Sequence, residues 1–412
     1  MSTTLVGEEV ARAGAAAAPL GPPPRRPVHA LTGIRIVAAL WVVLFHIRGN
    51  LYSEFPGLDR WVGPVLDQGG LGVDLFYVLS GYVLVLNYGS RMGQRFHLGA
   101  SGRFWWARLA RVWPAYVVTL MVAALWHGYL LATEQNDPAA PRDFSVLSFL
   151  RQMFLVVQWT EPDSDRLTWN GPAWTVSAEA LAYVAFPVLI LLVYRFAAVF
   201  SARGLAVLAL ACVVPTAILI ASFGTLYAPF LWMLRIGGSF LAGAVACAAV
   251  QHLRGSSRER AWASHLALGV VVVMVAGFFA ADRAGLAHVT PAFAIPLFVA
   301  LVGALGLADR HLARLLSTRV FVVGGMASYS VYLVHMLLVE PVWWLQGEYD
   351  VLAPGTTGSA VAFVALPFLI VAVGYALWRW FEEPARRRMK AMGAVRATAV
   401  PTAGDAARAA RR

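Results

Sequence analysis

The chain has 412 residues, of which 59% are apolar and only 13% are charged, and its mean hydropathy is +0.65. Average soluble domains carry about twice this share of charged residues, so the composition excludes an ordinary soluble protein and indicates a polytopic membrane protein. The formal net charge of +11 would suit nucleic-acid binding, but the arginines lie beside apolar stretches, where they set membrane topology. We therefore expect a lipid bilayer, and no nucleic acid, as a partner.

The two ends of the chain differ from its middle. Residues 1–30 are rich in alanine, proline and arginine, and they contain no apolar core of signal-peptide length before a cleavage site. We predict a disordered cytoplasmic tail at 1–30, a transmembrane domain at 31–388, and a disordered basic cytoplasmic tail at 389–412.

Ten apolar segments follow the first tail, and each is long enough to cross about 30 Å of hydrocarbon as a helix. They cover residues 31–48, 70–88, 110–132, 174–194, 204–222, 229–250, 264–281, 291–308, 320–346 and 359–381. A shorter apolar patch at 146–159 carries Arg151 and predicts an interfacial or re-entrant segment. The predicted fold class is all-α, with about ten transmembrane helices.

The distribution of charge predicts the orientation of these segments. With ten spans and both termini in the cytoplasm, arginines gather in the cytoplasmic loops, whereas aspartates and glutamates gather in the outer loops. If residues 146–159 also crossed the membrane, every later loop would be inverted and this pattern would be lost. We therefore predict a multi-pass protein of the cell's inner (cytoplasmic) membrane.

Three arginines near the inner face are candidates for anion binding. Arg35 and His46 lie eleven positions apart in the first span, which corresponds to about 16 Å along a helix. Arg108 and Arg111 begin the third span, and with Arg35 they form a possible clamp for phosphate groups, which guanidinium groups bind well. The alternative is ordinary anchoring by arginines at the membrane interface, with His46 capping the far interface.

A second set of ionisable residues is predicted at one depth in the outer half. It comprises His46, Asp74, Glu179 and His335, on four separate spans. A carboxylate beside an imidazole fixes the tautomer and raises the basicity of the ring, which suits general-base chemistry on a hydroxyl. The alternative for each residue is a hydrogen bond that packs two helices together. Arg235 is a candidate partner for Asp74 or Glu179.

The remaining polar residues give weaker signals. Cys212 and Cys247 both lie in apolar stretches, so they indicate neither a disulfide framework nor the spacing of metal ligands. We expect no metal site. His127 is interpreted as an interfacial residue.

Six motifs occur in order along most of the chain. They read LTGIRIVAALWVVLFH, GGLGVDLFYVLSGYVL, RLARVWPAY, NGPAWTVSAEALAYVAFP, ASYSVYLVH and FEEPARRR. In these motifs and their order, the chain resembles the membrane-bound acyltransferase-3 family, whose members O-acetylate glycans. It departs from the family pattern at Thr32 and Ile36, where a charged residue and a second glycine are usual, and at Thr175, where serine is common.

The resemblance implies an O-acyltransferase. The donor would be a cytoplasmic acyl-CoA, with acetyl-CoA as the first candidate, and no cofactor would be bound permanently. The acceptor would be a hydroxyl of a glycan, of a lipid or lipid-linked sugar, or of a secondary metabolite such as a macrolide-type sugar. Neither the acceptor nor the acyl length follows from the resemblance.

The resemblance also implies roles for individual residues. Arg35, Arg108 and Arg111 would hold the donor, and His46 would be the catalytic imidazole, with Glu179 or Asp74 as its partner. Whether His46 acts as a base or is itself transiently acylated is left open. The substrate channel would be lined by Tyr116, Trp174, Ser177, Tyr329, Ser330, Tyr332 and His335.

Two other functions compete with this one. Histidines and arginines inside the membrane can also line the path of a transporter for a small organic anion or a proton-coupled solute. The ordered motifs and the lack of internal repeats favour the enzyme. A structural subunit of a glycan-export complex is the third possibility, and the presence of both His46 and Arg35 argues against it.

Overall fold

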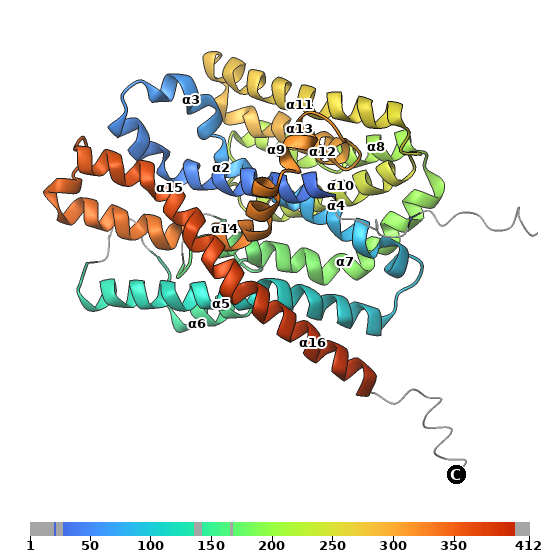
Figure 1. Ribbon diagram of the computed structural model, residues 1–412, viewed down its shortest axis with the longest axis horizontal. Coiled ribbons are helices and arrows are strands. Elements are labelled where there is room, and N and C mark those ends of the chain that lie inside the picture. The colour runs from blue at the N-terminus through green and yellow to red at the C-terminus, as the bar shows by residue number, and fades with distance from the viewer. Residues whose placement is uncertain (1–19, 22–27, 136–141, 165–167, 400–412) are drawn as a thin grey trace, which may run out of the picture.

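The structure is a computed structural model that describes residues 20–21, 28–135, 142–164 and 168–399. All regular elements in this described part are helices, as Figure 1 shows. Ten helical segments are long and apolar enough to cross a membrane. The predicted all-α fold with ten candidate spans is confirmed, so the chain is a multi-pass membrane protein.

The helices vary widely in length. In chain order they are α2 (His29–Glu54), α3 (Leu58–Leu66), α4 (Gly72–Met92), α5 (Leu98–Ala132), α6 (Val146–Met153), α7 (Ala173–Val199), α8 (Ala202–Ala211), α9 (Val214–Phe223), α10 (Leu231–Gln251), α11 (Ser257–Arg283), α12 (Thr290–Leu305), α13 (Leu312–Leu316), α14 (Arg319–Glu348), α15 (Thr357–Leu377) and α16 (Glu383–Ala399). Helix α6 is only about 12 Å long, too short to cross a bilayer, so the 146–159 patch is no span.

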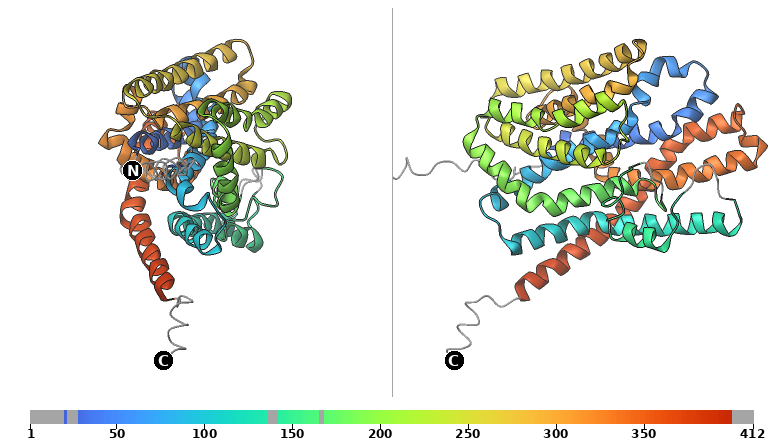
Figure 2. Two further views of the ribbon diagram at one scale, coloured as in Figure 1. Left: turned by 90° about the vertical axis from the view of Figure 1, so that its right-hand side faces the viewer. Right: turned by 180° about the vertical axis from the view of Figure 1, so that it is seen from behind.

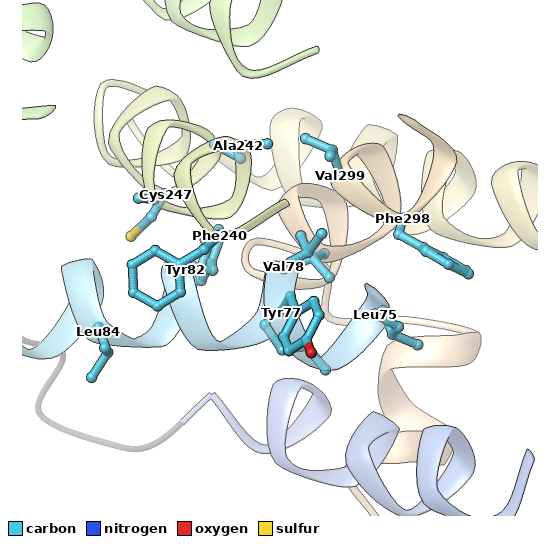
Figure 3. Packing of buried hydrophobic residues seen from close by; sticks show 14 of the residues in the cluster. Leu75, Tyr77, Val78, Tyr82, Leu84, Phe240, Ala242, Cys247, Phe298 and Val299 are labelled. Atoms are coloured by element: carbon cyan, nitrogen blue, oxygen red, sulfur yellow. The ribbon is translucent and has the colours of Figure 1, made fainter. Parts of the chain in front are cut away.

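The tightest packing lies between α4 and α10. A Cβ atom added to Gly81 would collide with the carbonyl oxygen of Phe240, and one added to Gly243 would collide with that of Val78. Small residues allow membrane helices to approach this closely. Figure 3 shows the surrounding core, where Val78 of α4 and Phe240 of α10 lie near Phe298 of α12. This core holds Asp74 and Arg235, on α4 and α10, inside one packed unit.

A second close contact joins α2 to α14. A Cβ atom at Gly325 would collide with the carbonyl oxygen of Thr32, and one at Gly33 would collide with that of Leu316 on α13. The contact fixes α2 beside α14. It thereby brings His46 of α2 and His335 of α14 into the same region.

The predicted tails differ in part from the structure. Leu20 is fully buried, and the amide of Gly21 donates a 3.1 Å hydrogen bond to Gln251 at the end of α10, so this part of 1–30 packs on the bundle. Helix α16 continues to Ala399 and projects from the bundle in Figures 1 and 2, although disorder was predicted from residue 389. The indole of Trp106 donates a 2.7 Å bond to the carbonyl of Met389, which ties α16 to α5. Residues 1–19, 22–27 and 400–412 lie outside the described part.

Candidate active site

Arg35 of α2 lies among charges of both signs. The carboxylate of Glu179 on α7 attracts its guanidinium, and the guanidinium of Arg108 on α5 repels it. Among the described residues, Arg35 makes no hydrogen bond or ion pair. Glu179 instead accepts hydrogen bonds from the hydroxyl of Tyr183, at 2.6 Å, and from that of Ser80. The guanidinium of Arg35 is therefore a cation that no described residue holds by a hydrogen bond.

Arg108 is held by aromatic rings. Its guanidinium carbon lies 5.6 Å from the centre of the Tyr88 ring and 6.0 Å from that of Phe104. One terminal nitrogen donates a 3.3 Å hydrogen bond to the Tyr88 hydroxyl, and Nε is buried with no partner in the described part of the chain. Aromatic faces attract a cation without cancelling its charge. Arg108 therefore still carries an uncompensated positive charge.

Arg111 differs from the other two arginines because it has a carboxylate partner. It forms an ion pair with Glu382, which is fully buried in the short π-helix Trp378–Glu382. The hydroxyl of Ser330 donates a 2.5 Å hydrogen bond to the other oxygen of Glu382. Of the three arginines of the predicted clamp, only Arg35 and Arg108 thus lack a carboxylate partner among the described residues. Arg111 and Ser330 join α5 and α14 to the end of the last span.

The two histidines of the predicted site lie side by side. The ring centres of His46 and His335 are 4.9 Å apart. Nδ1 of His46 lies 2.8 Å from the carbonyl oxygen of Val42, and Nδ1 of His335 contacts that of Tyr332. A carbonyl oxygen can only accept, so each neutral ring carries its proton on Nδ1 and presents a lone pair at Nε2. Nε2 of His335 is buried and has no hydrogen-bond partner among the described residues.

Asp74 was predicted to lie beside His46, but in the structure its carboxylate pairs with Arg235. Its two carboxylate oxygens accept hydrogen bonds from Nε and Nη2 of Arg235, at 3.1 and 2.7 Å. Asp74 and Arg235 are 0% and 2% exposed, so they form a buried, bidentate and electrically neutral pair. This confirms Arg235 as a partner of Asp74.

Glu179 does not pair with His46 either. Its partner Ser80 lies six residues after Asp74 on α4, which is about 9 Å along the helix. Glu179 therefore belongs to the level of Arg35 and not to that of Asp74. The start of the span was predicted to within one residue, at 174 against Ala173 in α7. The prediction failed because Glu179 lies about 9 Å beyond the start of α7, whereas Asp74 lies close to the start of α4, and both had been treated as lying at the start of a span.

A large cavity opens beside His46. Its volume is about 960 Å³, which is within the usual range for small-molecule sites. The predicted residues that line it are His46, Trp174 and Tyr332, together with Arg235. Three further tryptophans also line it, namely Trp126, Trp343 and Trp344. The Tyr332 hydroxyl lies 2.9 Å from that of Thr175, which fixes α14 against the start of α7.

Other predicted channel residues have structural partners. The Ser177 hydroxyl donates to the carbonyl of Leu155 at 2.8 Å and accepts from the amide of Gln158 at 3.1 Å, so it anchors the segment after α6. The Tyr329 hydroxyl donates a 3.0 Å bond to the carbonyl of Val112. Tyr116 is different, because its buried hydroxyl has no hydrogen-bond partner in the described part of the chain.

One charged group in the cavity wall was missed in the sequence. Glu340 of α14 accepts a 2.9 Å bond from Arg142, and its second oxygen lies 3.3 Å from Nε2 of His127. All three residues line the 960 Å³ cavity. The signal for Glu340 was present in VHMLLVEPVWW, where a carboxylate interrupts an apolar span. His127, predicted to be interfacial, belongs to this group.

The arginines, the imidazole pair and the cavity together form a site whose reactive groups are side chains. Among the described residues, no group of three or more His, Cys, Asp or Glu side chains is placed to hold a metal ion. The site comprises a cationic end at Arg35 and Arg108 and an imidazole pair beside a cavity with aromatic walls. Since both Arg35 and His46 are on α2, the two ends are about 16 Å apart along that helix.

Several proteins are similar to parts of this chain, and two of them are named as acyltransferases. Acyltransferase MdmB of Streptomyces mycarofaciens is 27% identical over 161 residues, which cover 38% of each chain. A protein of Staphylococcus aureus strain COL, named as an O-acetyltransferase, is 27% identical over 175 residues, covering 40% of this chain and 25% of that one. The chain thus aligns with less than half of either relative. Protein 2 in the picA locus of Rhizobium radiobacter is 32% identical over 171 residues, covering 40% of this chain and 82% of that one.

The family comparison covers much more of the chain. No solved structure matches the chain. A family model described as an acyltransferase domain matches residues 28–379, which include α2 to α15 and, apart from Glu382, the site residues described above. The chain therefore belongs to the acyltransferase-3 family of membrane-bound acyltransferases.

Proposed function

We propose that the protein transfers an acyl group, with acetyl as the first candidate, from acyl-CoA to a hydroxyl group of an acceptor bound in the 960 Å³ cavity. The observation that carries this proposal is the position of His46, which lines the cavity and holds its Nδ1 proton against the Val42 carbonyl. Its Nε2 is therefore the basic nitrogen.

The donor end of the proposed site rests on Arg35 and Arg108. Neither makes an ion pair with a described residue, and both are available to the phosphates of CoA, which guanidinium groups bind strongly. Arg35 lies about 16 Å along α2 from His46, a distance that the pantetheine arm would bridge. The hydroxyl of Tyr116, on the same helix as Arg108, has no partner among the described residues and would donate a hydrogen bond to that arm.

The acceptor end rests on the walls of the cavity. Trp126, Trp174, Trp343 and Trp344 offer flat apolar faces, and the Arg142–Glu340–His127 group offers charged hydrogen-bonding atoms. This mixture suits an acceptor that has both apolar faces and hydroxyl groups, such as a glycan, a lipid-linked sugar or a glycosylated metabolite.

In the proposed reaction, the acceptor oxygen attacks the thioester carbonyl while Nε2 of His46 takes the hydroxyl proton. A C–O bond forms and the C–S bond breaks, and the imidazolium returns the proton to the departing CoA thiolate. In the alternative route, Nε2 itself attacks the thioester carbonyl, so that an N–C bond forms while the C–S bond breaks and CoA leaves as the thiolate. The acceptor oxygen then attacks the acyl-imidazole, an O–C bond forms while the N–C bond breaks, and the hydroxyl proton passes to the thiolate. Both routes use the same nitrogen and give the same products.

The function is tested with the purified full chain in nanodiscs, with radiolabelled acetyl-CoA and a lipid and glycan extract of the host cells as acceptor. We expect free CoA thiol to appear in step with label on an extract component. A transporter reconstituted in vesicles would instead accumulate label without cleaving the thioester, and that result would overturn the proposal.

A further inference from the structure

A second cavity lies well away from the candidate active site. It is a groove of about 600 Å³ between α8, α10, α11 and α12, whose labels stand together in Figure 1. It shares no lining residue with the first cavity. Its walls are mainly small and apolar, with Ala206, Ala249 and Ala300 each on a different helix.

Positive charge is gathered at one end of this groove. Arg203 and Arg258 line it at the starts of α8 and α11, and neither makes an ion pair with a residue that the structure describes. Glu259 also lines this end, and its carboxylate accepts bonds from the amide and hydroxyl of Ser256 at 2.7 and 2.9 Å as part of the capping box of α11. One negative charge, held at the start of its own helix, therefore stands against the two arginines, which remain in excess. The first turn of α8, which contains no acidic residue, adds further partial positive charge there.

The dimensions of the groove match one leaflet of a bilayer. On α8 its wall runs from Ala202 to Leu210, and on α11 from Arg258 to Leu266, which is about 12 Å in each case. Half of the hydrocarbon core is about 15 Å thick. Trp262, which is 67% exposed, stands near the charged end, where tryptophan is typical of the membrane interface. The charge pattern of the sequence predicts that this is the cytoplasmic leaflet.

We propose that this groove binds one anionic phospholipid, with an acyl chain along the alanine walls and the phosphate between Arg203 and Arg258. The positive charge of the two arginines favours a lipid with an anionic headgroup. A soluble ligand would need polar groups along the walls, and a zwitterionic lipid would bring its own choline cation close to the two arginines together with its phosphate, whereas an anionic lipid brings negative charge alone. Basic pockets between membrane helices bind acidic headgroups in this way. The proposal does not depend on the acyl-transfer reaction.

The test is native mass spectrometry of the delipidated full chain with equal amounts of dioleoyl phosphatidylglycerol and dioleoyl phosphatidylcholine. We expect phosphatidylglycerol adducts to dominate. Arg203→Gln and Arg258→Gln should each lower the preference by about fivefold. Arg314→Gln is the matched control, because Arg314 is exposed and lies outside the groove. Equal binding of the two lipids to the unaltered chain, or an unchanged preference in both groove variants, would contradict the proposal.

A groove-filling variant separates this site from general attraction to charge. Ala249→Phe should reduce retention of both lipids while the melting temperature of the protein in detergent stays close to that of the parent. Full retention of phosphatidylglycerol by a folded Ala249→Phe protein would place the lipid elsewhere. If that variant does not fold, Arg203→Gln and Arg258→Gln still decide the question.

Discussion

The imidazoles of His46 on α2 and His335 on α14 lie with their ring centres 4.9 Å apart, and each uses Nδ1 to contact a backbone carbonyl of its own helix. Only His46 lines the large cavity, whereas His335 is fully buried behind it. The two rings therefore have different expected roles. His46 is positioned to touch substrate, and His335 supports its neighbour.

We expect His46→Ala to reduce acyl transfer at least about 100-fold, because general-base catalysis contributes this much or more. The fold should persist, since His46 makes no ion pair or hydrogen bond to another helix within the part of the chain that the structure describes. Label transfer from acetyl-CoA measures the rate, and the elution profile and melting temperature of the variant provide the control.

His335→Ala should lower kcat with little change in KM for acyl-CoA, since His335 touches no substrate in this account. His335→Asn, whose amide can still donate toward the Tyr332 carbonyl, should recover part of the lost rate. A merely structural role would affect the melting temperature of both variants and spare kcat in the folded fraction.

Arg108→Ala and Arg35→Ala should each raise KM for acyl-CoA by about tenfold or more, the usual effect of losing a hydrogen bond between charged groups. Neither residue has a carboxylate ion-pair partner among the described residues, so stability should change little. Steady-state kinetics with varied acyl-CoA measures the effect. An unchanged KM in both variants would mean that the donor phosphates bind elsewhere.

Arg111→Ala should act on stability, because it leaves Glu382 buried and unpaired, at a cost of about 3 kcal/mol or more. The double variant Arg111→Met with Glu382→Leu removes both charges and should restore much of the stability and expression. Thermal unfolding in detergent compares the two. A stable Arg111→Ala protein with a raised KM for acyl-CoA would instead return Arg111 to the donor site.

Asp74 is tested in the same way. Asp74→Leu alone leaves Arg235 buried without its partner and should destabilise the protein, whereas Asp74→Leu combined with Arg235→Met should regain stability. If Asp74 has no catalytic role, the double variant keeps a substantial kcat. A folded double variant with His46→Ala-like activity would show that the pair takes part in the reaction.

The sequence was sufficient to predict the spans and the helix that carries Arg35 and His46. A run of about 20 apolar residues can form only a membrane helix, and two positions on one helix have a known separation. The depth of Glu179 was wrong because this residue lies about 9 Å beyond the start of α7, whereas Asp74 lies close to the start of α4. An error of a few residues moves a side chain by several ångströms.

Ion pairs between helices were harder to predict. A hydropathy pattern says nothing of the rotation of one helix relative to another, and this rotation decided that Asp74 meets Arg235 and not His46. Arg111 and Glu382 are 271 positions apart in the chain, and nothing in the local sequence of either residue indicates the other as its partner. Arg142 reaches Glu340 from the loop that precedes α6, so that contact depends on the tertiary fold.

The central claim is tested most directly by following acetyl-CoA cleavage by the unaltered chain and by His46→Ala, both purified in nanodiscs and supplied with the same host-cell extract. We predict that the unaltered chain releases CoA thiol together with label transfer, and that His46→Ala, equally folded, does so at least about 100-fold more slowly. Equal rates from the two proteins would contradict the assignment of His46 as the group that activates the acceptor or carries the acyl group.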